Sequence, residues 1–99
     1  MNPKTLQCLM SYKDLIEMYL TKKIDIKGLT QRYDKLFFNQ KHIDKNIFSL
    51  LEKIFEAIDA CEPNEKIRSK QSDYISETTL REELKVYLKE LKDIVKKNK

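Results

Sequence analysis

The sequence contains very few of the residues that turn, break or cross-link a chain. Among its 99 residues there are one glycine, two prolines, two cysteines and a single histidine. So little glycine and proline argues against an all-β fold, which needs many tight turns. Cys8 and Cys61 lie far apart with no CxxC motif and no histidine nearby, which excludes a zinc ribbon or a thioredoxin-type site. We therefore expect two reduced thiols in a cytoplasmic protein.

Long apolar runs and the common catalytic motifs are absent as well. The apolar runs are short and interrupted by charges, so we expect neither a membrane span nor a signal peptide. There is no glycine-rich phosphate loop, no second imidazole and no cluster of metal-ligating residues. His42 stands in a polar connection, which is typical of a surface residue. We predict that the protein is not an enzyme and needs no cofactor or metal.

The composition that remains is that of one small folded domain. Hydrophobic residues make up 40% of the chain, which argues against disorder, while 36% charged residues predict a heavily solvated surface. A chain of this length allows a single domain, residues 1–99, with one modest core.

Charge is distributed unevenly along the chain. Residues 1–41 hold eight Lys or Arg against four Asp or Glu, and residues 66–99 hold ten against six, so each segment has a net charge of +4. Residues 42–65 hold only Lys45 and Lys53 against six acids, a net charge of −4. An acidic block inside a basic protein indicates a partner other than nucleic acid for this segment.

Hydrophobic periodicity predicts four helices, over residues 4–21, 26–38 and 44–61 and from residue 76 to the C-terminal lysines. Their apolar positions recur at helical spacing: Leu9, Tyr12, Leu15, Ile16, Tyr19 and Leu20; Ile26, Leu29, Tyr33, Leu36 and Phe37; Ile47, Leu50, Leu51, Ile54, Phe55 and Ile58; Leu80, Leu84, Tyr87, Leu88, Leu91 and Val95.

Short polar residues mark where these helices begin. Asn2, which precedes a proline, is a candidate N-cap for the first helix, and Ser11 offers a second possible start for that helix. Asp25 and Ser76 are candidate N-caps for the second and fourth helices. Pro63 stops the third helix.

Residues 62–75 show no convincing period, and connections of this length in a small bundle are often functional. We expect Tyr74 and Ile75 to hold the far end of this connection against the core. The fold class predicted is all-α, an antiparallel four-helix bundle with a long connection between its third and fourth helices.

The acidic row on the third predicted helix is the strongest candidate for a binding site. Glu52, Glu56 and Asp59 are spaced i, i+4, i+7, and Glu62 continues the row. Like charges at this spacing cost a helix roughly 0.2–0.5 kcal/mol per pair, and acids in the C-terminal half oppose the helix dipole. Two interpretations follow: a site for a partner rich in Lys and Arg, or a solvated face neutralised by cations on other helices.

Several segments together resemble the bacterial colicin D-type immunity family, which includes immunity proteins of contact-dependent growth inhibition. The similarity extends over residues 12–93. It is carried by the run YKDLIEMYL at 12–20, by residues 23–25 and 29–37, by Phe48 and the apolar positions that follow it, and by residues 58–63, 74–77 and 80–81.

The resemblance implies a four-helix bundle that binds and neutralises a cognate toxin nuclease. In the colicin D branch that toxin cleaves transfer RNA, and acidic side chains of the immunity protein occupy its basic cleft in place of the RNA backbone. Carried onto this chain, the expected toxin contacts are Glu56, Asp59 and Glu62, with Glu52, Asp73 and Tyr74 as a second group. The partner is thus a protein, with no direct nucleic-acid or membrane contact.

Two other functions compete with this one. The first is a small nucleic-acid-binding protein, with residues 25–38 as a recognition helix. Its phosphate contacts would come from two basic clusters, Lys22 with Lys23 and Lys96 with Lys97 and Lys99. The acidic third helix would repel nucleic acid and disfavours this function. A helical adaptor for another protein is the third alternative.

Overall fold

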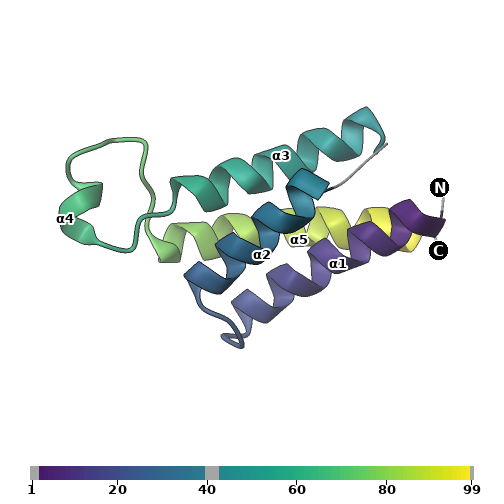
Figure 1. Cartoon of the computed structure of the whole chain (residues 1–99), viewed down its shortest axis with the longest axis horizontal. Helices are drawn as coiled ribbons and strands as arrows, with labels where there is room; N and C mark the ends of the chain where they lie inside the picture. Colours follow the sequence, from purple (N-terminus) through teal and green to yellow (C-terminus); the bar gives the residue numbers. More distant parts are fainter. Residues whose placement is uncertain (1–2, 40–42, 99) are drawn as a thin grey trace.

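The computed structural model describes residues 3–39 and 43–98. Its helices are α1 (Pro3–Leu20), α2 (Ile26–Asn39), α3 (Lys45–Ala60), α4 (Glu65–Arg68) and α5 (Glu77–Lys97) (Figure 1). The predicted all-α class is confirmed, and the four long helices begin and end within one residue of the sequence-based bounds. The interpretations of Asn2 as a helix cap and of His42 as a surface residue fall outside the described residues.

Side-chain caps fix where three of the long helices begin, and at the start of α3 Asp44 Oδ1 accepts from the Asn46 backbone N–H at 2.8 Å. The other two caps are those predicted from the sequence. The Ser76 hydroxyl accepts a hydrogen bond from the Thr79 backbone N–H at 3.2 Å, at the start of α5. Asp25 Oδ1 accepts one from the Gly28 backbone N–H at 2.8 Å, at the start of α2. Each cap satisfies a backbone donor that the first turn of a helix leaves without a partner. Both predicted starts are therefore confirmed.

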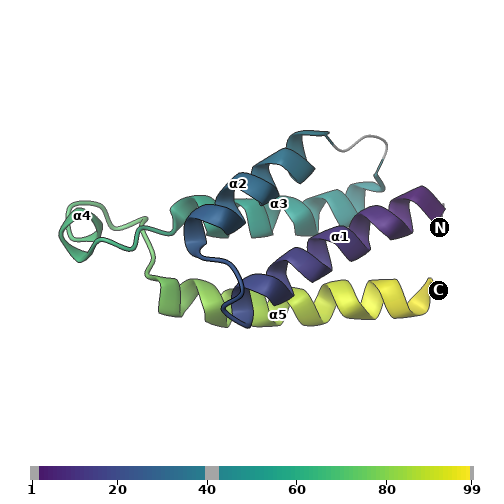
Figure 2. The same ribbon diagram turned by 60° about the horizontal axis from the view of Figure 1, so that its bottom comes forward.

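The four long helices form the body of the molecule. α1 packs against α2 and α5, and α3 packs against the same two helices. Figures 1 and 2 show that α1 begins and α5 ends at one end of the molecule, while α4 projects at the other. Among the described residues, no helix has a stretch long and apolar enough to cross a lipid bilayer.

The core is built from the apolar stripes that the periodicity identified. The fully buried large side chains are Leu9, Tyr12, Ile16, Tyr19, Leu29, Tyr33, Leu51, Ile54, Leu80, Leu84 and Leu91. Six further positions of the predicted stripes pack against this core at its rim, where they are only partly buried: Leu20, Ile26, Leu36, Phe37, Phe55 and Tyr87. Rim positions share the helical phase of the core, so periodicity alone does not separate the two.

The connection between α3 and α5 was predicted to have no periodic structure, but part of it is helical. It contains the single-turn helix α4, whose first turn is capped by Asn64: the side-chain oxygen accepts from the Lys66 backbone N–H at 2.9 Å. One turn is too short to produce a hydrophobic period, which is why the pattern of the sequence missed it. α3 also ends at Ala60, one residue earlier than predicted, so that Cys61 lies just outside the helix.

Hydrogen bonds join the two ends of this connection. Cys61 and Ile75 form an isolated parallel bridge, in which the Ile75 N–H donates to the Ala60 carbonyl and the Glu62 N–H donates to the Ile75 carbonyl, each at 2.9 Å. Arg68 Nη1 donates to the Glu62 carbonyl oxygen at 2.7 Å, across the base of the loop. The connection is therefore a closed loop on the end of α3 and α5.

Buried phenols and a thiol make the fold sensitive to alkaline pH. Burial raises the pKa of Tyr19 and of Tyr33 well above the ordinary value of 10.0, and burial with nearby Glu77 raises the pKa of Cys61 from 9.0 to about 11. At a pH between the ordinary pKa of such a group and its raised pKa in the folded chain, the unfolded chain releases a proton that the folded chain keeps. The unfolded state then binds fewer protons, so the free energy of unfolding falls as pH rises.

We therefore expect urea midpoints to be constant up to about pH 9 and to decrease steadily towards pH 11. A Cys61→Ala variant should show a shallower decrease over this interval. An unfolding midpoint that stayed level across it would contradict the burial of these groups.

Candidate functional site

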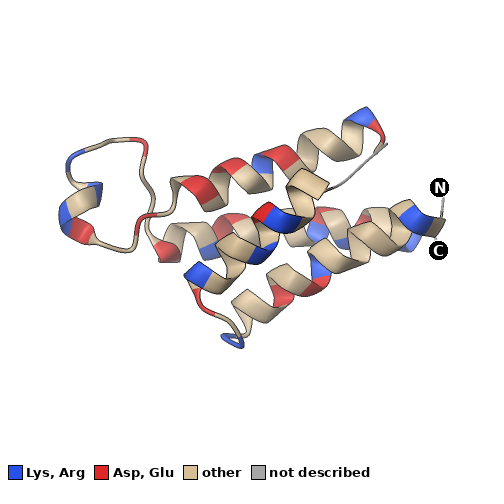
Figure 3. Ribbon diagram, viewed as in Figure 1, with Lys and Arg blue, Asp and Glu red and all other residues tan. Residues whose placement is uncertain are grey.

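The acidic row predicted from the sequence lies on the outward face of α3. Glu52, Glu56 and Asp59 are all exposed, whereas Leu51 and Ile54, on the opposite side of the same helix, are fully buried. Figure 3 shows acidic segments recurring along α3. The three carboxylates thus form one continuous surface, which we call the α3 acidic row.

The α3 acidic row has no cationic partner in the described part of the chain. The ion pairs found there involve acids of other helices: Lys13 with Asp14 and Glu17 on α1, Lys92 with Glu17, and Arg81 with Glu77 on α5. Lys92 and Glu17 meet at 3.3 Å and join α5 to α1. Cations therefore neutralise acids elsewhere in the fold, and the α3 row stays unpaired within the described ranges. This disfavours the interpretation of the row as a face neutralised by neighbouring helices.

Two acidic side chains of α5 lie near Glu56 of the row. Tyr87 is half-buried on α5, and burial together with the negative charges of Glu83, Glu90 and Glu56 raises its pKa. Glu56 therefore shares its surroundings with two carboxylates that sequence reasoning did not select. Only the packing of α3 on α5 brings them together, because thirty or so positions separate them in the chain.

Glu62, Asp73 and Tyr74 lie on the closed loop rather than on the helix. Glu62 is half-buried, and its Oε1 accepts a hydrogen bond from the Asn64 backbone N–H at 3.1 Å, so this carboxylate supports the turn into α4. The bridge at Ile75 brings Glu62 next to the strand-like end that carries Asp73 and Tyr74. Asp73 is exposed and Tyr74 is half-buried. Of the two residues expected to hold this end, Ile75 packs against the core cluster and Tyr74 is not part of it.

Four phenylalanines from α2 and α3 form a cluster that sequence reasoning missed. The Phe37 ring stacks on Phe55 at 4.8 Å between centroids and on Phe48 at 5.6 Å, while Phe38 meets Phe55 edge-on at 5.6 Å. Phe37 and Phe55 cover the core, but Phe38 is 71% exposed and Phe48 is 38% exposed. We call this set the phenylalanine cluster. The i, i+7 spacing of Phe48 and Phe55 was the available signal.

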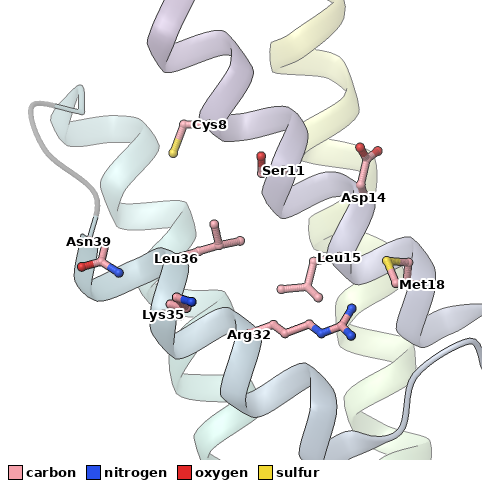
Figure 4. Close-up of a pocket in the computed structure, with 9 residues that line it drawn as sticks. All are labelled: Cys8, Ser11, Asp14, Leu15, Met18, Arg32, Lys35, Leu36 and Asn39. Atoms are coloured by element: carbon pink, nitrogen blue, oxygen red, sulfur yellow. The ribbon is translucent and has the colours of Figure 1, made fainter.

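A groove between α1 and α2 is a concave feature of the fold. It encloses about 590 Å³ and is lined by nine residues shown in Figure 4. Leu15, Met18 and Leu36 make much of its wall apolar, and Arg32 and Lys35 reach it from α2. Among the described residues, no three His, Cys, Asp or Glu side chains are grouped so that they could hold a metal ion.

The two cysteines are free thiols with little nucleophilic character. Cys8 lines the groove, and burial raises its pKa. Cys61 follows α3 and has a pKa of about 11, raised first by burial and then by Glu77 and Glu62. A thiol with a raised pKa is protonated at neutral pH and is a poor nucleophile. The geometry therefore offers a binding surface, and its cysteines are not activated for catalysis.

Comparison with known proteins identifies the family to which the chain belongs. A family model described as bacterial self-protective colicin-like immunity matches residues 8–91. The match covers most of the chain, and the chain belongs to this family. No match was found among the curated proteins or among the solved structures. The immunity class inferred from the resemblance is thus confirmed, while the colicin D-type or contact-dependent branch stays a prediction.

Proposed function

We propose that this immunity protein binds a cognate toxin nuclease and blocks its basic substrate cleft with acidic side chains. The toxin would be a transfer-RNA-cleaving domain of the colicin D or contact-dependent inhibition type, neutralised in the cytoplasm of the producing cell. The observation that carries the proposal is the α3 acidic row, which is exposed and without a cationic partner in the described residues of a colicin-like immunity protein. The protein acts by stoichiometric binding, not by catalysis.

The spacing of the row suits a cleft built for a phosphate backbone. An α-helix rises 1.5 Å per residue, so Glu52, Glu56 and Asp59 repeat once per turn over about 10 Å. A nuclease cleft carries Lys and Arg to bind phosphates, and these cations pair equally well with carboxylates. The complementary charges also speed association, which suits an inhibitor that must capture its toxin before RNA is cut.

Glu56 and Asp59 form the centre of the proposed contact surface. They lie on the half of α3 that leads into the closed loop, where Glu62, Asp73 and Tyr74 are available to the same partner. Glu52 extends the row in the other direction. The proposal treats the four long helices as an antiparallel bundle that holds α3 rigid, which is supported by the packing of α3 on both α2 and α5.

Co-expression with the toxin domain tests the proposal. The chain is co-purified with the C-terminal domain encoded by the gene immediately upstream, and the free toxin domain is then assayed for cleavage of transfer RNA. We expect a complex of one copy each, and cleavage that falls in proportion to added immunity protein and stops at one equivalent. An affinity of nanomolar or tighter corresponds to roughly −12 kcal/mol. Absence of both a complex and protection would refute the proposal.

A further inference from the structure

The phenylalanine cluster and the α3 acidic row share one stripe of the surface. Phe48, Glu52, Phe55 and Asp59 follow one another at intervals of four, three and four residues along α3. At about 100° per residue these positions fall within one narrow sector of the helix. Aromatic rings and carboxylates therefore alternate along the same line, and α2 adds the exposed ring of Phe38 beside it.

The exposure of Phe38 is not explained by the fold. Its ring touches Phe37 at 5.7 Å and Phe55 at 5.6 Å between centroids, yet 71% of the residue is open to solvent. Phe37 and Phe55 already cover this part of the core without it. Grouped exposed aromatic side chains mark interaction surfaces more often than scattered ones do, and buried aromatic residues supply much of the binding energy of protein interfaces.

We infer that the phenylalanine cluster is the apolar anchor of the toxin interface. Its occupant is a patch of apolar side chains on the toxin, flanked by Lys or Arg that pair with Glu52 and Asp59. The inference rests on the proposed function and adds the chemistry of the partner surface: a basic cleft with an apolar rim.

Charge decides between this occupant and the alternatives. A second copy of the chain docked on the same stripe in a two-fold dimer would bring the Glu52 and Asp59 carboxylates of both copies together, and like charges facing each other in an interface oppose association. Single-stranded RNA stacks on exposed aromatic rings, but its phosphates would meet the same carboxylates. A cationic protein surface is the partner that satisfies both the rings and the acids.

The two parts of the surface act on different steps of binding. Exposed carboxylates steer the encounter, so they set the association rate and its dependence on salt. Rings that become buried in the complex must be re-exposed on separation, so they set the dissociation rate. Substitutions in the cluster and in the row should therefore give separable kinetic effects.

The test measures association and dissociation rates of the purified toxin domain with the full chain and its variants. We expect Phe38→Ser to raise the dissociation rate about 30-fold, the size typical of an interface hot spot, while the association rate changes less than about threefold. Val86→Ser is the matched control, because Val86 is 59% exposed on α5 and lies outside the cluster. Its rates should equal those of the unmodified chain. Circular dichroism should show all three proteins equally helical.

Each contrary result identifies what fails. If the unmodified chain binds the toxin and Phe38→Ser and Phe48→Ser both leave the dissociation rate unchanged, the anchor is refuted and the proposed function survives. If the unmodified chain does not bind the toxin, both fail together. A concentration-dependent dimer abolished by Phe38→Ser would assign the cluster to a second copy, and single-stranded RNA binding lost in the same variant would assign it to nucleic acid.

Discussion

Reversing the charge of Glu56 and Asp59 together is expected to abolish toxin neutralisation without weakening the fold. Both residues are exposed on α3, and neither has an ion-pair partner among the described residues. Each Glu→Lys or Asp→Lys reversal replaces an attraction with a repulsion in the basic cleft, and such changes cost about 2 kcal/mol or more apiece. The dissociation constant of the double variant should therefore rise at least about a thousandfold.

The same variant should be as stable as the unmodified chain, or slightly more stable. Lysine at position 56 turns its i, i+4 repulsion with Glu52 into an attraction, and both lysines place positive charge in the C-terminal half of α3, where the helix dipole favours it. The pair at 56 and 59 stays like-charged, so the net gain in stability is small. Binding and stability thus change in opposite directions. Calorimetric titration with the toxin domain measures the first, and thermal unfolding measures the second.

Glu82→Lys is the control for this pair, since Glu82 is an exposed acid on α5 and belongs to neither the row nor the Tyr87 surroundings. Its effect on affinity should be below about tenfold. A Glu56→Lys, Asp59→Lys protein that still protects against the toxin would show that occlusion by α3 is wrong. One that loses its helical signal would show instead that these carboxylates are structural.

Removing the Tyr33 side chain should have the largest effect on stability. Tyr33 is fully buried, its ring lies 5.1 Å from that of Tyr12, and its hydroxyl donates to the Leu51 carbonyl at 2.7 Å. It thereby joins α1, α2 and α3. Replacement of a buried aromatic residue by alanine costs about 3–5 kcal/mol, and domains of this size are stable by only about 5–15 kcal/mol.

We expect Tyr33→Ala to lower the melting temperature by more than about 10 °C, and Tyr33→Phe by a smaller amount, since it loses only a hydrogen bond worth about 0.5–1.5 kcal/mol. Thermal unfolding followed by circular dichroism measures both. Equal melting temperatures for the two variants would mean that the ring contributes nothing beyond its hydroxyl. Because Tyr33 holds α2 on α3, Tyr33→Ala should also loosen the phenylalanine cluster.

The sequence predicted those features that depend on neighbours within one helix. Helical periodicity identified Leu9 and Leu84 as core, and the cap preferences of Asp25 and Ser76 located two helix starts. The α3 acidic row was visible for the same reason, because i, i+4, i+7 spacing needs no knowledge of other helices.

Features that depend on which helices pack together were not predictable in this way. Phe38 meets Phe55 only because α2 packs on α3, and Glu56 approaches Tyr87 only because α3 packs on α5. That the row forms no ion pair with the other helices in the described residues is likewise a property of the assembled fold. Single-sequence patterns carry no information on these pairings.

The bridge between Cys61 and Ile75 makes the structure of the helical body independent of the length of the loop. Since the ends of the loop are fixed by backbone hydrogen bonds, the residues between them can change in number without moving α3 or α5. Closing a flexible loop of twice the length costs only about 0.6 kcal/mol more. If the proposed function holds, the loop can therefore change to suit a different toxin while the same helical body keeps α3 in place.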